Sequence, residues 1–517
     1  MQSHYPLITA DIVPTRMQSR RRLAWRMRTR RVLAYLLALL LLTASALSLL
    51  IYTEEMRQVM MPLLALLDIL ALFYLVMWTR TPAAPLELGT LYAAAIFLYA
   101  AIPILNYLAG GLHWTIVSDG RLFHSKMTPV ELGGFSWLNV VYLGAFAGAY
   151  LLFRGWVGSV PSGKIIPPAR KSVIVLLTLA IVLVAFFAVL QALTGVKMSA
   201  SYAEAGTVAQ QIQRLPYVVE QIATHLFEVL FTLKIALAVL LVTRFEQKWA
   251  RWLLGGWLLL EVVLSVTRMG SRSEMVLLLL SVTLAYHWWV KPLKTAVLLP
   301  VGTLLLAAFL VLGIVRSINQ QGVKVPPAEM LAVACAHPAV VAGMTNEFQT
   351  LFATAYDLQQ RKQRGVLTVP WQLYISDLYM VIPKQLLPFT KIDPSQWYLE
   401  VIGQQDAGVG YMFGVLSQAV IGAGWLELLL RGALLGFLFA KLHRWFIHHG
   451  SAFSTTIIYT WLCVWCHYTY RSTTFYKVSD LLLHVLPVLW IMRVVAQESA
   501  TSSSEVTPPG SAGVSPA

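Results

Sequence analysis

The sequence predicts an all-α protein: a polytopic membrane helical bundle of about twelve transmembrane helices, with one large outer loop of short helices. Three observations support this fold class: the composition, the lengths of the apolar stretches and the positions of the basic residues. Of the 517 residues, 58% are hydrophobic and only 12% are charged, and the mean hydropathy is +0.67. A soluble protein carries roughly 25% charged residues, so much of this chain must face lipid.

Apolar stretches recur along the chain at a length that can cross the ~30 Å hydrocarbon core of a bilayer. The first of them follows about thirty residues of polar and basic sequence, which argues against a cleavable signal peptide. On hydropathy we place transmembrane helices near 32–53, 59–79, 86–109, 135–153, 172–194, 222–243, 251–267, 274–290, 295–315, 425–441, 453–468 and 479–495.

The charge pattern places both termini on the cytoplasmic side. Residues 1–31 end in a run of arginines, which stays on that side of a membrane and can contact anionic lipid. With this orientation the other basic residues fall in inner loops, as the positive-inside rule requires: Arg80, Arg154, Lys164, Arg170, Lys171, Arg244, Lys248, Arg251, Lys291, Lys294, Lys441, Arg444 and Arg493. The net charge of +15 is therefore assigned to membrane orientation and not to nucleic-acid binding.

The predicted topology divides the chain into five parts: a cytoplasmic polybasic segment at 1–31, the first nine transmembrane helices at 32–315, the large outer loop at 316–424, the last three transmembrane helices at 425–495 and a disordered cytoplasmic tail at 496–517. Within the loop, 409–423 is interpreted as an interfacial or re-entrant helix. If it crossed the membrane fully, Lys441 and Arg444 would face outward, against the charge rule.

Arginines at predicted outer helix ends indicate a binding site for an anionic ligand. Arg268 and Arg272 lie on a short Gly/Ser turn just before a helix that starts near 273, and Arg316 and Arg471 follow two other spans. Guanidinium groups bind phosphate with two hydrogen bonds, and the amides of a helix N-terminus add positive potential. The alternative is an ordinary turn with snorkelling arginines, or ion pairs with acids such as Glu274 and Asp480.

The large loop carries the side chains that could transfer a proton or contact a ligand. Carboxylates and neutral histidines can serve as bases, and the candidates are His337, Glu347, Asp357, Asp377, Asp393, Glu400 and Asp406. Aromatic rings suit either a membrane interface or stacking on sugars, and the loop offers Trp371, Tyr374, Tyr379, Trp397 and Tyr398. The sequence alone leaves both choices open.

Several other features admit a structural reading as readily as a functional one. Ionisable residues inside predicted spans, namely Asp68, Glu228, Lys234 and Glu261, are costly in lipid and suit either a relay or a buried pair. Gly144-x-x-x-Gly148 and Gly432-x-x-x-Gly436 are typical of close helix packing. Cys463-Val-Trp-Cys466-His467 matches a haem-attachment pattern, but it lies in an apolar helix, so no cofactor and no metal is expected.

Four segments resemble the Wzy-type family of bacterial oligosaccharide repeat-unit polymerases, which make O-antigen and exopolysaccharide. They are Gly270-Ser-Arg272-Ser at the start of an apolar helix, Ser376-Asp377-Leu-Tyr379-Met-Val-Ile-Pro383, the glycine-rich Gly408-Val-Gly410-Tyr-Met-Phe-Gly-Val-Leu-Ser-Gln418, and Arg471-Ser-Thr-Thr-Phe475. The likeness covers about residues 260–480. Many family members carry a glutamate where this chain has Gln418, and the N-terminal half matches in helix count alone.

The resemblance implies a metal-independent membrane glycosyltransferase of the bacterial inner membrane, with its active site facing the periplasm. Its substrate would be an undecaprenyl-diphosphate-linked oligosaccharide, and it would transfer the growing glycan to the non-reducing end of a new lipid-linked unit. Arg268, Arg272, Arg316 and Arg471 would hold the diphosphate, Asp377 or Glu347 would act on the acceptor hydroxyl, and Tyr379, Trp371 and Trp397 would contact the glycan.

The family also implies a flippase and a chain-length regulator as partners. Three alternatives stay open at this point: an O-antigen ligase-like transferase, which shares the donor; a lipid-linked oligosaccharide flippase or other transporter; and a membrane acyltransferase, for which His337 would be the natural anchor. A transporter is expected to show internal repeats and short loops, whereas this chain has no evident repeat and one long loop.

Overall fold

The computed structural model describes residues 39–48, 53–78, 86–108, 114–118, 121–125, 127–155, 161, 170–194, 216–267, 272–294, 296–298, 300, 302–303, 329, 346–379, 382, 386–403, 413–475 and 477–494. The predicted terminal segments 1–31 and 496–517 lie outside these residues, as does most of the predicted span 295–315. The described residues are predominantly helical, which confirms the helical character of the predicted fold.

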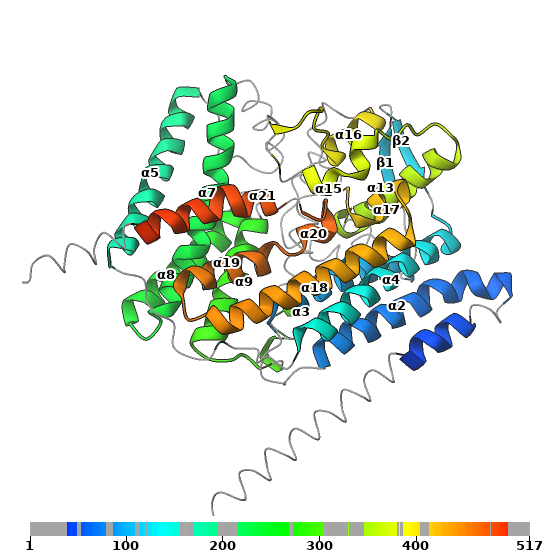
Figure 1. The fold of residues 1–517 in the computed structure, drawn as a ribbon, viewed down its shortest axis with the longest axis horizontal. Coiled ribbons are helices and arrows are strands. Elements are labelled where there is room, and N and C mark those ends of the chain that lie inside the picture. The colour runs from blue at the N-terminus through cyan, green and yellow to red at the C-terminus, as the bar shows by residue number, and fades with distance from the viewer. Residues whose placement is uncertain are drawn as a thin grey trace, which may run out of the picture.

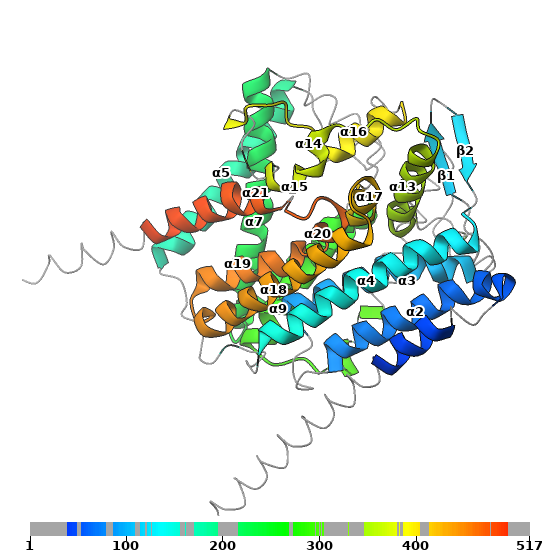
Figure 2. The same ribbon diagram turned by 45° about the vertical axis from the view of Figure 1, so that its right-hand side comes forward.

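One group of long helices lies side by side in both ribbon views (Figures 1 and 2). It consists of α2 (Glu54–Trp78), α3 (Leu88–Leu108), α4 (Pro129–Arg154) and α18 (Trp425–His449). Helix α4 begins with a capping box, in which Thr128 and Glu131 satisfy each other's backbone amides. Helix α18, from the last third of the chain, packs along α4, so this bundle joins distant parts of the sequence.

A second group of helices packs around α7 (Tyr217–Thr243). It contains α5 (Arg170–Thr194), α8 (Lys248–Thr267), α9 (Arg272–Trp289) and α19 (Phe453–Trp465). Helix α5 lies at the outside, against α7 (Figure 1). Helix α19 contacts α3, α9 and α18 as well as α7, and it thereby connects the two groups.

Five of the described helices are long and apolar enough to cross a membrane: Met60–Met77, Leu88–Leu108, Pro129–Arg154, Val173–Thr194 and Val218–Thr243. They correspond to the predicted spans 59–79, 86–109, 135–153, 172–194 and 222–243. The predicted spans 251–267 and 425–441 are helical within α8 and α18, which also carry charged side chains, and α19 has only 13 residues. The count of about twelve spans therefore stays a prediction.

The described part of the large loop folds into short helices over one end of the first bundle (Figure 2). They are α13 (Asn346–Gln363), α14 (Trp371–Tyr374), α15 (Ser376–Tyr379), α16 (Pro394–Val401) and α17 (Val415–Ile421). Beside α13 lies an antiparallel hairpin that the sequence did not predict, formed by β1 (Trp114–Ser118) and β2 (Arg121–Ser125). We call this assembly the loop unit. Its own apolar core comprises Leu358, Leu373, Trp397, Tyr398, Leu399, Ile402, Phe413 and Ile421.

The segment 409–423, expected to be an interfacial or re-entrant helix, contains α17. This helix has seven residues, a length of about 10 Å, and cannot cross a bilayer. It contacts α13, α4 and α18, and also α20 (Tyr468–Arg471), a short helix just after α19. After α20 the chain continues through α21 (Val478–Asp480) and the π-helical turn η2 (Leu481–Val485) into a helix that ends at 494.

A buried polar cluster joins four helices at the end of the first bundle opposite the loop unit. Glu87, fully buried just before α3, forms an ion pair with Arg154 at the end of α4, with distances of 2.7 and 2.9 Å. Tyr150 donates to Glu87 at 2.9 Å, and His443 of α18 lies 3.4 Å from the same carboxylate. Tyr459 of α19 contacts His443 at 2.7 Å. The charge pattern predicts that these helix ends lie on the cytoplasmic side of the membrane, and this orientation stays a prediction.

Candidate functional site

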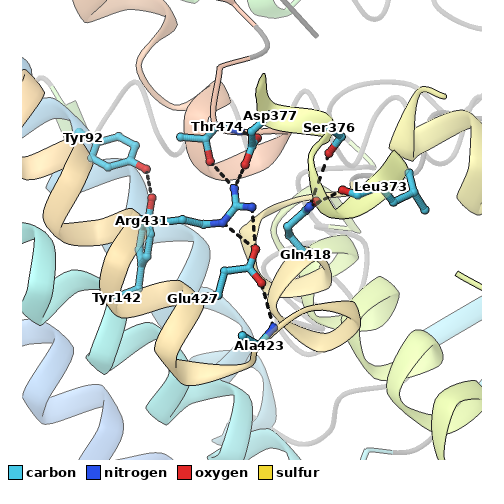
Figure 3. Close-up of polar contacts among 10 residues, drawn as sticks. All are labelled: Tyr92, Tyr142, Leu373, Ser376, Asp377, Gln418, Ala423, Glu427, Arg431 and Thr474. Carbon is cyan, nitrogen blue, oxygen red and sulfur yellow. Dashed lines mark hydrogen bonds and ion pairs between the residues drawn. The ribbon is translucent and has the colours of Figure 1, made fainter. Parts of the chain in front are cut away.

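The loop unit meets the first bundle at an ion-pair cluster around Arg431 (Figure 3). Arg431 lies in the second turn of α18, and one of its terminal nitrogens, Nη1, donates to Asp377 Oδ2 of α15. The same nitrogen donates to Thr474 Oγ1 at 2.7 Å. Asp377 is 9% exposed, and its second oxygen, Oδ1, accepts the backbone N–H of Thr474 at 2.6 Å. One carboxylate therefore binds both the bundle and the segment after α20.

Glu427 completes the cluster from α18 itself. Arg431 Nε donates to Glu427 Oε1 at 2.8 Å, and Nη2 lies 2.6 Å from the same oxygen. The other carboxylate oxygen accepts the backbone N–H of Ala423 at 3.1 Å. Residues four apart face the same side of a helix, so this pair forms within α18. All three guanidinium nitrogens thus have acceptors, and two carboxylates share one cation.

Gln418 of α17 connects the same region to α14 and α15 (Figure 3). Its side-chain nitrogen donates to the Leu373 carbonyl at 2.8 Å and lies 3.5 Å from Ser376 Oγ. Its carbonyl oxygen, Oε1, is buried and has no hydrogen-bond partner within the described chain. The neutral amide of Gln418 thus holds the short helix α14, which comes just before Asp377.

Gly414 allows the glycine-rich segment to lie against α20. A Cβ atom at this position would come within 2.6 Å of the Tyr470 carbonyl oxygen and 3.2 Å of that of Arg471. These distances are shorter than ordinary van der Waals contacts, so only glycine fits without a shift of the backbone. Three predicted motifs are therefore in direct contact: the segment at 376–379, the segment at 413–418 and the segment at 471–475.

The predicted diphosphate arginines are only partly described. Arg471 ends α20, and its guanidinium lies 5.2 Å from the centre of the Tyr468 ring. Helix α9 begins at Arg272, next to the predicted start near 273, but the Arg272 side chain lies outside the described part of the chain. Arg268 and Arg316 also lie outside it. Convergence of the four arginines on one ligand stays a prediction.

The three predicted glycan-binding rings occupy different surroundings. Trp371 is 56% exposed. Trp397 is buried in the apolar core of the loop unit, and Tyr379 is buried against Phe389. Burial raises the pKa of Tyr379 above its ordinary value, so the hydroxyl stays protonated and donates to the Ile392 carbonyl at 2.8 Å. Trp371 also packs edge-on against Phe389, at 5.1 Å between ring centres, so what distinguishes it from the other two rings is its exposure.

Two of the other loop acids, Asp357 and Asp393, have structural partners. Asp357 accepts from Arg361 at 2.8 Å and from Tyr398 at 3.2 Å. Asp393 caps α16 by accepting the amides of Ser395 and Gln396. Glu400 is exposed. The backbone of Glu347 lies in the first turn of α13, but its side chain is outside the described part of the chain, as are His337 and Asp406.

Ionisable side chains in the predicted spans have polar contacts within the protein, although Asp68 Oδ2 is buried with no hydrogen-bond partner among the described residues. Asp68 accepts from Ser45 at 3.1 Å, and Lys234 of α7 donates to Glu261 of α8 at 3.2 Å. Glu228 lies 3.7 Å from Lys477, whose ammonium also contacts the rings of Trp465 and Tyr468. His225 contacts His484 at 3.0 Å. These pairs fit the structural alternative that the sequence left open.

Among the described residues, no group of three or more His, Cys, Asp or Glu side chains could hold a metal ion. Cys463 and Cys466 are buried at the end of α19. No family model, no curated protein and no solved structure matches the chain. Function must therefore be inferred from the site itself.

Arg431 and Glu427 are the site residues that sequence reasoning missed. Both lie within the predicted span 425–441, which hydropathy treats as a plain apolar helix. A signal was available, because an acid and an arginine four residues apart at the outer end of a span are costly in lipid and pair readily. What the sequence could not show is their contact with Asp377, which is 54 positions away from Arg431.

Proposed function

We propose that this chain is a polymerase of undecaprenyl-diphosphate-linked oligosaccharide repeat units in bacterial surface or exopolysaccharide synthesis. It transfers the growing glycan to the non-reducing end of a new lipid-linked unit, at the periplasmic face of the inner membrane. The observation that carries the proposal is the meeting of three motifs at one site: Asp377 bonds to Thr474, Gln418 bonds beside Ser376, and Gly414 packs on Arg471.

The geometry favours an orienting role for Asp377. Its carboxylate accepts from Arg431 and from the Thr474 amide, which stabilises the ionised form. Each carboxylate oxygen has a further lone pair, which can accept a hydrogen bond from a sugar hydroxyl. Arg471, on the segment that holds Asp377, would face the donor diphosphate and stabilise it as the leaving group.

An O-antigen ligase-like transferase would use the same donor and a different acceptor, so it is the alternative within the same reaction class. A flippase or transporter is the alternative outside it. The loop unit is a packed assembly with its own apolar core at one end of the bundle, which suits a site for chemistry on large headgroups better than a passive connection. Partners such as a flippase and a chain-length regulator belong to this proposal.

The first test is complementation of a host whose repeat-unit polymerase has been deleted and which is supplied with the transferases of this chain's own locus. We expect a ladder of glycan lengths on a gel with the wild type. Arg272→Ala should reduce the ladder to single lipid-linked repeats, because the donor diphosphate loses a bidentate partner. Single repeats with the well-expressed wild type would refute the polymerase proposal and favour a ligase or a flippase.

Asp377→Asn tests the acceptor side of the same reaction. The amide keeps the shape of the side chain and can still accept from the Thr474 N–H, but it cannot pair with Arg431 as an anion. We expect polymer synthesis to fall about 100-fold or more, the lower range for loss of a positioned acid or base. Glu400→Gln, at an exposed loop position, is the matched control and should leave the ladder unchanged. An unchanged ladder with Asp377→Asn would contradict the assigned role.

A further inference from the structure

We propose that Arg431 is the positioning residue of this site, and that it holds the Asp377 carboxylate ionised and in one orientation by bridging it to Glu427. Neither Arg431 nor Glu427 belongs to the motifs that carry the family resemblance. The expected effect on catalysis rests on the proposed function. The effect of Arg431 on the protonation of Asp377 does not, and it can be measured without an activity assay.

The first step is that Glu427 fixes the Arg431 side chain independently of Asp377. Glu427 and Arg431 pair across one turn of α18, and the Ala423 amide orients the far oxygen of Glu427. The side chains of Arg431 and Glu427 are only 13% and 18% exposed. Two of the three guanidinium nitrogens are bound to Glu427, so the third, Nη1, points in a set direction toward Asp377 and Thr474 (Figure 3).

The second step is the charge balance. Two carboxylates share one guanidinium, so the cluster carries one surplus negative charge if both acids are ionised. Without the cation, two partly buried carboxylates would lie near each other, and one would take up a proton because like charges at short range oppose joint ionisation. Removing Arg431 also takes away the cation that donates to Asp377 Oδ2, so the pKa of Asp377 itself should rise.

The third step is that Asp377 joins elements from three parts of the chain. Its side chain connects α15 of the loop unit to α18 and to the Thr474 amide.

The elements around Asp377 carry other charged and titratable groups. They are Arg431 and Glu427 on α18, Tyr92 on α3, Tyr142 on α4, Arg471 on α20, and Lys477 and Asp480 beyond Thr474. Of these, Tyr92 and Tyr142 bond to each other at 2.5 Å, and Lys477 pairs with Asp480.

The test is the pH dependence of carbodiimide labelling at Asp377, read by mass spectrometry on the purified full-length protein in detergent. Dicyclohexylcarbodiimide reacts with protonated carboxyl groups that water-soluble reagents reach poorly. Loss of an opposite charge raises a carboxyl pKa by about 1–3 units, so Arg431→Gln should move the labelling midpoint of Asp377 to higher pH by that amount. Arg431→Lys keeps the charge and should keep the midpoint near that of the wild type.

Arg361→Gln is the matched control, because Arg361 also pairs with an aspartate of the loop unit, Asp357, at 2.8 Å. It should leave the Asp377 midpoint unchanged. In the polymer assay, Arg431→Gln should lower the rate and shift its acidic limb to higher pH, since the active site needs ionised Asp377 and the variant protonates it more readily.

The two proposals fail in distinguishable ways. No polymer with the wild type, together with a shifted labelling midpoint in Arg431→Gln, would refute the proposed function and leave Arg431 as the group that keeps Asp377 ionised. Wild-type polymer with an unshifted midpoint would overturn the role of Arg431. If Arg431→Gln does not fold, Arg431→Lys decides. Loss of polymer synthesis with a wild-type labelling midpoint of Asp377 would support the need for the oriented guanidinium group. Full activity of Arg431→Lys would contradict it.

Discussion

Arg154→Met is expected to lower the free energy of unfolding by about 3–5 kcal/mol, the range for removing one partner of a buried ion pair. Glu87 would remain fully buried and would lose the guanidinium that lies 2.7 and 2.9 Å from its carboxylate, while Tyr150 and His443 stay beside it. The measurement is the fraction of monodisperse protein that survives heating in detergent, compared with the wild type.

The size of this effect depends on burial, and a second ion pair provides the contrast. The Arg361 and Asp357 side chains are 21% and 16% exposed and lie four residues apart on α13. Arg361→Met should cost about 1 kcal/mol or less from the ion pair, since partly solvated pairs contribute little. The double variant Glu87→Gln with Arg154→Met should recover part of the loss. Equal melting of Arg154→Met and Arg361→Met would contradict the role of the Glu87 pair.

The long apolar helices could be predicted from the sequence because a span requires about twenty apolar residues in one run, and that signal is local. Met60–Met77, Leu88–Leu108 and Val173–Thr194 each match a predicted span to within a few residues. The signal weakens where charges interrupt the run. In α18, hydropathy placed the helix at 425–441 but gave no indication that Glu427, Arg431 and His443 belong to the Arg431 site or the Glu87 cluster.

The hairpin at 114–125 was missed although a signal existed. Asp119-Gly120 separates two short stretches, and an Asp-Gly pair is typical of a two-residue hairpin turn. The register agrees, because Ser118 pairs with Arg121. Strands of five residues surrounded by long apolar helices contribute little to a search based on membrane spans.

The candidate site could be predicted only in its parts. Asp377 and Arg471 stand out as chemically capable residues, but their neighbourhood depends on contacts between positions up to 97 apart, such as Asp377 with Thr474. Such contacts follow from the packing of α17 between α13 and α18, which no local pattern encodes. The same reason explains why the sequence predicted all three rings, Tyr379, Trp397 and Trp371, as glycan contacts. Residue type suggests stacking on a sugar, whereas the packing of the whole loop unit decides that Tyr379 and Trp397 are buried and Trp371 is exposed.

Gly436→Ala is expected to destabilise the protein by about 1–3 kcal/mol through overpacking between α18 and α4. A Cβ atom there would collide with the Phe146 carbonyl oxygen and lie 2.9 Å from the Tyr150 nitrogen. Backbone atoms of a helix cannot move aside singly, so α18 must shift against α4. Because α18 carries both His443 and Arg431, the shift should also loosen the Glu87 cluster and lower activity.

The other predicted packing motif supplies the control. A Cβ atom at Gly148 would meet no atom of another described element within 4 Å, and the residue lies exposed on α4. Gly148→Ala should therefore be neutral or slightly stabilising, as alanine favours a helix by about 1 kcal/mol over glycine. Heat stability in detergent compares the two variants directly. Similar losses in both variants would contradict overpacking as the cause of the Gly436→Ala effect, and a loss confined to Gly436→Ala would locate the close contact where α18 packs on α4.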